Sequence, residues 1–388
     1  MNARPIRVAL VTHYFGSHRG GVESVAGQLA SRLGKTGAFS IDWVSSNTTS
    51  PPSPLPGLNA IAVRAWNGLE RRGFPWPVWG PRGLSRLRRV IMGADIVHIH
   101  DFIYFPNIAA YVFARLARKP IVITQHIGDV PFPDPLLATT VRVINRTIGR
   151  WMLGNADQVV FISDAVRRSF TQFVRFRNEP MHVANGVDTA MFSPVDVMTR
   201  QRIRASLGVV AHDRVVLYVG RFVDKKGLPL LGRLARALPE YRWWFAGWGE
   251  AGSASHPATW QLPHVRMFGD RSGATLAELY VAADLLVLAS LSEGFPLVVQ
   301  EALACGTPAL VAERIVDGAP AAREHLRTAS IDGDDARVVE NWTTNIARTL
   351  DENRDCARSD ALAQFARDEW SWPATVARYE SIFRGVVR

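Results

Sequence analysis

The chain has 388 residues, a net charge of +10 at neutral pH and only two cysteines. This length exceeds the size at which one hydrophobic core keeps growing, so we expect two domains. An apolar fraction of 47% excludes a disordered chain, and two cysteines exclude a disulfide framework. The positive charge suggests nucleic acid, an anionic membrane surface or an anionic substrate as the partner.

Short apolar segments alternate with helical patterns through the first half of the chain. The expected strands are residues 6–12, 41–46, 95–100, 120–125 and 157–163. Continuous apolar strands separated by helices indicate a parallel sheet covered on both faces. The apolar run at the N-terminus is too short for a signal sequence, and no window has the length of a membrane span, so we expect a cytoplasmic protein.

The same alternation restarts in the second half. The expected strands are residues 214–221, 242–247, 265–270, 284–290 and 307–312, with helices from Leu228 and across 276–283. This repeat predicts an α/β fold with two doubly wound halves. We place the boundary in the turn-rich segment after residue 185, which gives domains of residues 1–185 and 186–373.

Two segments near the end of the chain remain, and only the last one has a clear secondary-structure pattern. Residues 313–335 show only a weak pattern. The end of the chain carries Trp372, Val376, Tyr379 and Phe383 at helical spacing. This spacing predicts an amphipathic helix whose large apolar face needs a partner.

A glycine pair follows the first expected strand, at the edge of the sheet where ligands of open α/β folds bind. Gly20 and Gly21 allow the backbone to approach a ligand closely, and the next helix offers free N–H groups to an anion. The segment lacks the G-x-G-x-x-G pattern, which disfavours a nicotinamide or flavin site. An ordinary strand-to-helix turn is the alternative.

Two cations follow the first strand of the second half. Arg221 stands at the end of the strand, and Lys226 precedes the next helix. An arginine that forks onto oxygens and a lysine that acts as a point charge suit a diphosphate. A solvated basic loop is the alternative.

The segment 292–308 is apolar but keeps two carboxylates, Glu293 and Glu301. Free amides at Gly294, Phe295 and Leu297 can meet phosphate oxygens at the start of a helix, while carboxylates accept hydrogen bonds from sugar hydroxyls. The preference of acidic residues for helix N-termini explains Glu293 but not Glu301. The segment therefore predicts a site for a diphosphate and sugars.

The spacing of the two glutamates gives E-x7-E, and six further motifs occur in order along the chain: GGVE, HIHD, TQH, NGVD, YVGRFVDKKG and FAGWGE. Together they resemble the landmarks of the GT-B glycosyltransferases of family 4, retaining enzymes that use nucleotide-sugar donors. The resemblance covers roughly residues 6–312. It implies two doubly wound Rossmann-like domains that face a central cleft, the first for the acceptor and the second for the donor.

The resemblance assigns roles in donor binding. It implies that Glu301 holds the donor ribose, Arg221 and Lys226 the diphosphate, and Gly20 with Gly21 the far side of that diphosphate.

It further implies that Glu293 and His126 contact the transferred sugar and that helix 374–388 packs back onto the first domain. We expect no cofactor and no metal, because the cations and helix amides stabilise the leaving diphosphate. Residues 313–329 lack the glycine-rich segment of the family, so no contact is assigned there.

Two other patterns suggest metal sites. Asp332 and Asp334 in DGDD match the D-x-D of metal-dependent transferases, but we find no strand before them and interpret them as a solvated loop. His98 and His100 share one face of a strand without an apparent third ligand. We interpret them as core or substrate-facing histidines.

The acceptor is suggested by a segment, Arg64–Val90, in which aromatic residues alternate with arginines. These residues are Trp66, Arg71, Arg72, Phe74, Trp76, Trp79, Arg82, Arg86, Arg88 and Arg89. Such a composition suits an anionic membrane surface, which would place the protein at the inner face of the cell membrane. A loop with a solvated basic rim is the alternative here, and for a similar strip at 167–178.

These observations favour a glycosyltransferase that acts on a saccharide or lipid-linked saccharide in cell-surface polysaccharide or glycolipid biosynthesis. A GT-B sugar-nucleotide epimerase, which needs no acceptor, is the first alternative. A nucleic-acid binder is the second, suggested by charge alone, and no nucleic-acid-binding motif supports it. We therefore expect no nucleic-acid partner.

Overall fold

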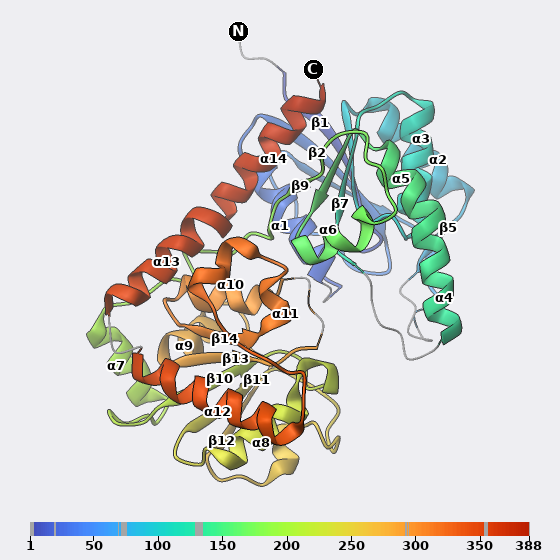
Figure 1. Cartoon of the computed structure of the whole chain (residues 1–388). Coiled ribbons are helices and arrows are strands. Elements are labelled where there is room, and N and C mark those ends of the chain that lie inside the picture. Colours follow the sequence, from blue (N-terminus) through green and yellow to red (C-terminus); the bar gives the residue numbers. More distant parts are fainter. Residues whose placement is uncertain are drawn as a thin grey trace. The chain divides into compact units, whose positions relative to one another are not determined.

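The computed structural model describes residues 4–18, 21–68, 70, 76–128, 135–291, 293, 295–352 and 356–387. The chain divides into two compact units, Met1–Asn185 with Thr375–Arg388, and Gly186–Ala374. Each unit has an α/β fold of its own (Figure 1).

The first unit contains a parallel sheet of seven strands in the order β3-β2-β1-β6-β7-β8-β9. Its strands are β1 (Ile6–Val11), β2 (Phe39–Ser46), β3 (Leu58–Val63), β6 (Ile96–His100), β7 (Ile121–Gln125), β8 (Gln158–Phe161) and β9 (Met181–His182). Strands β6 and β7 are buried throughout, as expected for a sheet covered on both faces. A short antiparallel pair, β4 (Ala65–Trp66) and β5 (Val78–Trp79), lies apart from this sheet.

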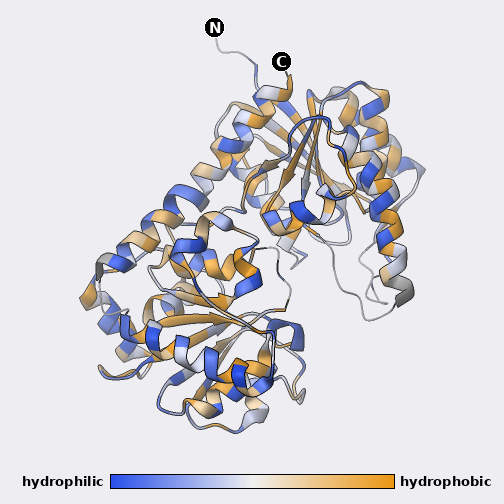
Figure 2. Ribbon diagram, viewed as in Figure 1, coloured by the Kyte–Doolittle hydropathy of each residue, from blue (hydrophilic) through white to orange (hydrophobic). Residues whose placement is uncertain are grey.

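Helices pack on the first sheet through their apolar faces. The strands are the most apolar part of the first unit (Figure 2). The helices are α1 (Gly21–Lys35), α2 (Pro81–Gly93), α3 (Phe105–Leu116), α4 (Pro135–Ile144), the π-helix η2 (Asn145–Gly149), α5 (Arg150–Asn155) and α6 (Asp164–Thr171).

The C-terminal helix α14 (Trp372–Val387) begins in the second unit and ends in the first. Within the first unit, the ring of Phe383 packs edge-on against Phe39 with centroids 5.8 Å apart, and the Tyr379 hydroxyl lies 2.9 Å from Thr124 Oγ1. The apolar face of this helix is therefore buried against the first sheet.

The second unit contains a parallel sheet of six strands in the order β12-β11-β10-β13-β14-β15. Its strands are β10 (Val215–Val219), β11 (Arg242–Ala246), β12 (Val265–Gly269), β13 (Leu285–Leu288), β14 (Ala309–Ala312) and β15 (Arg327–Ala329). Its helices are α7 (Val197–Ser206), η3 (Asp224–Lys226), α8 (Leu228–Ala237), η4 (Pro257–Trp260), α9 (Ala274–Ala282), α10 (Leu297–Ala304), α11 (Glu313–Val316), η5 (Pro320–His325), α12 (Asp335–Glu352) and α13 (Cys356–Trp370).

The predicted α/β class, with two doubly wound parallel sheets, is confirmed. Every strand expected from the sequence is present, whereas β3, β4, β5, β9 and β15 were not predicted. Strands β3, β9 and β15 are the last strands at sheet edges, where one side lacks a neighbour and the apolar signal is weak, and β4 and β5 are only two residues long. Strand β15 ends three residues before Asp332, so the expectation that no strand precedes DGDD was wrong.

The segment Arg64–Val90 is only partly the exposed strip that the sequence suggested. Trp79 is 2% exposed and donates from Nε1 to Ser46 Oγ at 2.8 Å, so it belongs to the core and cannot enter a membrane. Trp66 is exposed, whereas Leu87 on α2 is buried. Residues 71–75, including Arg71, Arg72 and Phe74, lie outside the described residues.

The segment's other arginines beyond Arg64 lie on the exposed face of α2. They are Arg82, Arg86, Arg88 and Arg89. In the second strip, Phe170 and Val174 are buried in the core, while Arg177 pairs with Asp157 at 2.7 Å. The second strip is thus a solvated rim over a packed aromatic core.

Candidate active site

The strand orders define one edge in each unit as the position for a ligand. In the first sheet the order in which successive strands are added reverses at β1, which lies between β2 and β6, and in the second it reverses at β10, which lies between β11 and β13. Ligands of doubly wound sheets bind at such switch points, outside the carboxyl ends of the strands. The candidate residues of the second unit follow β10 and β13, and those of the first follow β1 and β7.

The loop after β10 is built to pass close to the loop after β13. Gly227 has a φ of 81°, and a Cβ there would lie 2.2 Å from the carbonyl oxygen of Ala289, so only glycine fits. The amide of Leu291 donates to the carbonyl of Lys225 at 2.9 Å. These contacts hold the turn η3, which carries Lys226, beside the end of β13.

Lys226 and Glu293 are brought together by this arrangement. Lys226 Nζ donates to Glu293 Oε1, and the two side chains are only 21% and 14% exposed. These two residues have separate expected roles, and their ion pair was not predicted from the sequence. Because each partner satisfies the other's charge, the pair explains how Glu293 is kept in a mostly apolar segment.

Arg221 remains exposed at the end of β10. Its guanidinium carbon lies 5.8 Å from the ring centroid of Trp248, which is itself 53% exposed. The Tyr218 hydroxyl donates to the carbonyl of Arg221 at 2.9 Å and fixes the backbone there. Arg221 therefore presents a cation at the same edge as the Lys226–Glu293 pair.

Glu301 lies one turn and a half into α10 and accepts a hydrogen bond from the hydroxyl of Tyr280 at 2.8 Å. Burial raises the pKa of Glu301 to about 7, although the bond from Tyr280 acts in the opposite direction. Tyr280 is a neutral partner, and its single hydrogen bond leaves the Glu301 carboxylate able to accept from further hydroxyl donors.

The start of α10 matches the expected helix, with Pro296 as its N-cap and Leu297 as its first residue. Phe295 is 6% exposed and packs on Trp370 with ring centroids 5.2 Å apart, so only its main chain can face a ligand. Gly294 lies outside the described residues.

In the first unit, Gly21 is the first residue of α1, as expected, while Gly20 lies outside the described residues. A buried pair in the same unit was not predicted from the sequence: His13 Nε2 lies 2.8 Å from Glu23 Oε1. Burial lowers the pKa of His13, so a neutral imidazole donates to the carboxylate. His13 lies two residues after the end of β1, and this position could have indicated a site residue.

His126 follows β7 and forms a buried contact with His100, whose Nδ1 lies 2.8 Å from His126 Nε2. Burial lowers the pKa of His126 to about 4, so it is neutral at pH 7. Asp101, at a φ of 61°, accepts from the amides of His126 and Ile127 at 2.7 and 3.2 Å. A neutral histidine on a fixed backbone can bond a sugar hydroxyl but supplies no charge to a phosphate.

His98 does not form a metal pair with His100. Its Nε2 lies 2.8 Å from Thr124 Oγ1, and burial lowers its pKa to about 3, as for a neutral core histidine. The described residues contain no group of three or more His, Cys, Asp or Glu side chains suited to a metal ion.

The aspartates of DGDD are engaged by arginines at the surface. Asp332 is 79% exposed and pairs with Arg314 at 2.7 Å, and Asp335 is 77% exposed and pairs with Arg233 at 2.8 Å. The interpretation of this segment as solvated is confirmed, although a strand does precede it.

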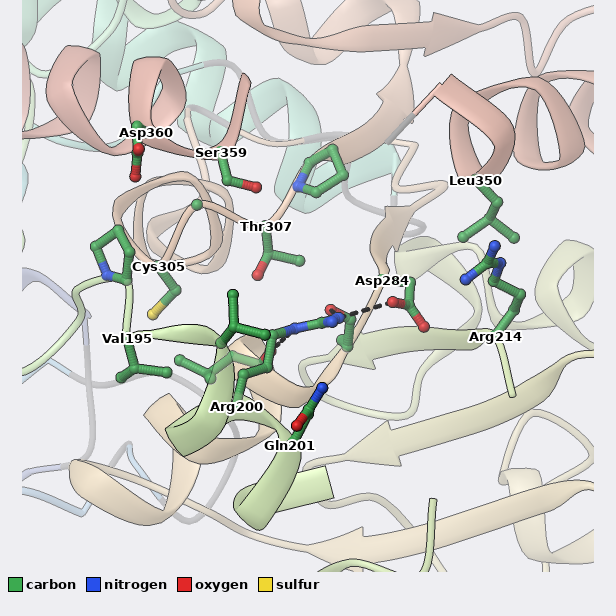
Figure 3. A pocket seen from close by; sticks show the side chains of 16 residues that line it. Val195, Arg200, Gln201, Arg214, Asp284, Cys305, Thr307, Leu350, Ser359 and Asp360 are labelled. Atoms are coloured by element: carbon green, nitrogen blue, oxygen red, sulfur yellow. Dashed lines mark hydrogen bonds and ion pairs between the residues drawn. The ribbon is translucent and has the colours of Figure 1, made fainter. Parts of the chain in front are cut away.

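A pocket of about 380 Å³ lies at the opposite edge of the second sheet (Figure 3). Its lining includes Arg200 and Asp284, which pair with each other at 2.7 Å, and Thr307. Asp284 and Pro308 stand just before β13 and β14, at the amino ends of the strands. The pocket is therefore separate from the candidate donor residues.

The pKa of Glu301 predicts a pH-dependent affinity for a nucleotide sugar. Since this pKa is raised to about 7, the carboxylate is depleted below that pH, and the affinity should rise from about pH 6 to pH 8 and then level off. Calorimetry with a nucleotide sugar, whose diphosphate does not titrate in this range, measures it. In Glu301→Gln the profile should be flat and the affinity lower; a flat profile in the wild type would contradict the prediction.

Comparison with known families identifies the class that this fold and edge geometry define. Residues 19–191 match the model named Glycosyltransferase Family 4, and residues 199–330 match the model named Glycosyl transferases group 1. Together the two models cover most of both units. The chain is a glycosyltransferase of the family 4 type with the GT-B fold.

Similar proteins agree with this assignment. The chain is 29% identical over 218 residues to a protein of Bacillus subtilis named as a teichuronic acid biosynthesis glycosyltransferase, with 55% of this chain and 51% of that protein covered. It is 28% identical over 348 residues to the D-inositol 3-phosphate glycosyltransferase of Corynebacterium aurimucosum, with 83% and 80% covered. The match thus spans about half the length of the Bacillus relative and four fifths of the other.

Among solved structures, HepE of Anabaena in complex with UDP has a similar fold. Its TM-score is 0.76 at 16% identity, with 98% of this chain and 100% of HepE covered. HepE has also been solved with UDP-glucose. At this identity the likeness shows the fold alone. The matched families are glycosyltransferases, and nothing in the comparisons supports the epimerase alternative.

Proposed function

We propose that this glycosyltransferase moves a hexosyl unit, with retention of configuration and without a metal, from a nucleotide sugar to a saccharide or lipid-linked saccharide. The observation that carries the proposal is the meeting of two loops at the carboxyl edge of the second sheet. There, Arg221 and Lys226 after β10 lie with Glu293 after β13, and Glu301 follows on α10.

The charges at this edge suit a nucleotide diphosphate. The exposed guanidinium of Arg221 is available for diphosphate oxygens, and Lys226 can turn from Glu293 to the phosphate when the donor binds. Glu301 then accepts from the ribose hydroxyls. HepE, which shares the fold, has been solved with UDP and with UDP-glucose, and this supports a donor of the same chemical class.

The reaction breaks the bond between the anomeric carbon and the diphosphate oxygen, and a bond to the acceptor oxygen forms on the same face of the sugar. Positive charge develops on the sugar ring while the diphosphate leaves with negative charge. In this proposal Arg221 and Lys226 stabilise the leaving group, and the Glu293 carboxylate stabilises the ring or binds its hydroxyls. The proton of the acceptor hydroxyl passes to the departing diphosphate oxygen as the new bond forms.

Transfer is expected to survive chelation. The protein would be incubated with UDP-, GDP- and ADP-sugars and saccharide acceptors, with and without EDTA, and the anomeric configuration of the product determined by NMR. Transfer with retention at an unchanged rate is the expected result, since cations of the protein serve the diphosphate. Loss of transfer with EDTA that magnesium restores, or an inverted product, would contradict the proposal.

We further propose that α2 attaches the protein to an anionic membrane surface. Among the described residues no helix combines the length and apolar character needed to cross a bilayer. The outer face of α2 carries Arg82, Arg86, Arg88 and Arg89, all exposed, and each basic residue near an anionic bilayer contributes about 1 kcal/mol. The acceptor chemistry that fits this surface is a lipid-linked saccharide. The relative named as a teichuronic acid biosynthesis glycosyltransferase supports a role in cell-surface glycan synthesis.

Cosedimentation with liposomes tests this attachment. The protein should bind anionic vesicles at low salt and bind them less as the salt concentration rises. It should not bind neutral vesicles. Reversal of Arg86, Arg88 and Arg89 to glutamate should release it without changing donor affinity, because none of the proposed donor-binding residues lies on α2. The matched control reverses three exposed arginines of the second unit, Arg202, Arg236 and Arg348, and should still bind. If the wild type fails to bind at low salt, the acceptor is soluble and the arginines form a solvated rim.

A further inference from the structure

We infer that Tyr280 is a positioning residue of the donor site, which holds the Glu301 carboxylate in the orientation that binds the nucleotide ribose. The inference rests on the proposed function, because Glu301 is assigned to the ribose there. Tyr280 lies outside the E-x7-E motif, on α9, and no sequence pattern marked it.

The contact between the two residues is specific. Tyr280 is fully buried, and its hydroxyl donates to Glu301 Oε2 at 2.8 Å. A carboxylate has lone pairs for further donors, so this one bond fixes the group without using its capacity to accept from ribose hydroxyls. A hydrogen bond to an ionised acceptor is also stronger than one between neutral groups.

Tyr280 is itself held at both ends. The Thr307 hydroxyl donates to the Tyr280 carbonyl at 2.7 Å, and the ring of Phe192 packs edge-on against the tyrosine ring at 5.9 Å. The side chain of Thr307 lines the pocket of Figure 3, which lies at the amino ends of β13 and β14. The phenol is therefore fixed in place, and the carboxylate that it bonds is fixed with it.

The hydroxyl of Tyr280 distinguishes a role in positioning Glu301 from a role in core packing alone. Phenylalanine would fill the same volume in the core, and only the bond to Glu301 would be lost. Glu301 would then be free to rotate within a partly buried site that disfavours its charge. The Tyr280→Phe variant should consequently lose affinity that depends on the ribose hydroxyls and keep the affinity that depends on the diphosphate.

Calorimetry with paired nucleotides measures this selectivity. UDP, GDP and ADP are titrated into the wild type, and the tightest is compared with its 2′,3′-dideoxy form. The wild type should prefer the ribonucleotide, and Tyr280→Phe should reduce that preference about tenfold while binding the dideoxy form as before. In turnover, the donor KM should rise and kcat should change little. Tyr379→Phe removes another buried tyrosine hydroxyl, the one bonded to Thr124, and should keep the full preference.

Glu301→Ala should abolish the preference, and Tyr280→Phe should add nothing in that background. An unchanged preference in Tyr280→Phe, or an equal loss for both nucleotides, overturns the positioning role and leaves the proposed function standing. A wild type that binds none of the nucleotides, or binds ribo and dideoxy forms equally, overturns the ribose role of Glu301 and both proposals with it.

Discussion

Replacement of Glu293 by alanine is expected to lower kcat by about 100-fold to 1,000-fold and to leave the donor KM largely unchanged. The residue is 14% exposed and stands beside Lys226 at the edge where the transferred sugar is proposed to bind. A group that acts on charge developing in the transition state affects turnover more than ground-state binding. Steady-state kinetics with the correct donor and acceptor measure both constants.

The control for this variant is Glu278→Ala, which removes an exposed carboxylate from α9 in the same unit. It should behave as the wild type. If Glu293→Ala turns over at the wild-type rate, Glu293 has no part in the chemistry, and the Lys226–Glu293 pair is only structural.

Replacement of Arg221 by alanine is expected to lower kcat/KM by about 100-fold to 1,000-fold, because it removes a fixed cation from the departing diphosphate. Arg221 lies beside Trp248, and its charge has no carboxylate partner among the ion pairs of the described residues. The effect should appear in kcat and in the affinity for nucleoside diphosphates, which calorimetry measures separately.

Arg233→Ala is the matched control, since it removes an arginine of α8 that pairs with the exposed Asp335. It should leave donor affinity unchanged. Equal behaviour of the Arg221 and Arg233 variants would exclude a role for Arg221 in holding the diphosphate.

Much of the fold could be predicted because its central strands are buried on both faces. Segments such as Leu285–Leu288 are continuous apolar runs, and their alternation with helices already indicates a doubly wound sheet. The short edge strands carry less of this signal. Helix α2 was not predicted for a different reason, because exposed arginines interrupt its apolar residues. Trp79, just before this helix, is buried in the core, although its neighbours in sequence suggested an exposed strip.

The charged residues of the candidate site could be predicted from the sequence, but the contacts between them could not. Arg221, Lys226 and Glu293 stand out as charges in the loops that follow strands, and Glu301 stands out as a charge within an apolar helix. Their partners depend on how loops meet: Lys226 reaches Glu293 only because Gly227 lets two loops approach. Tyr280 reads as an ordinary core residue in sequence, and only the three-dimensional contact with Glu301 distinguishes it.

The measurement that tests the central claim most directly is calorimetric titration of UDP-, GDP- and ADP-sugars, in the presence of EDTA, into the wild type and into the double variant Arg221→Ala with Lys226→Ala. We predict saturable binding of at least one nucleotide sugar to the wild type and an affinity at least about 100-fold lower in the double variant, since both cations serve the diphosphate. Absence of binding to the wild type, or equal affinity in the double variant, would contradict the assignment of the donor site to this edge of the second sheet.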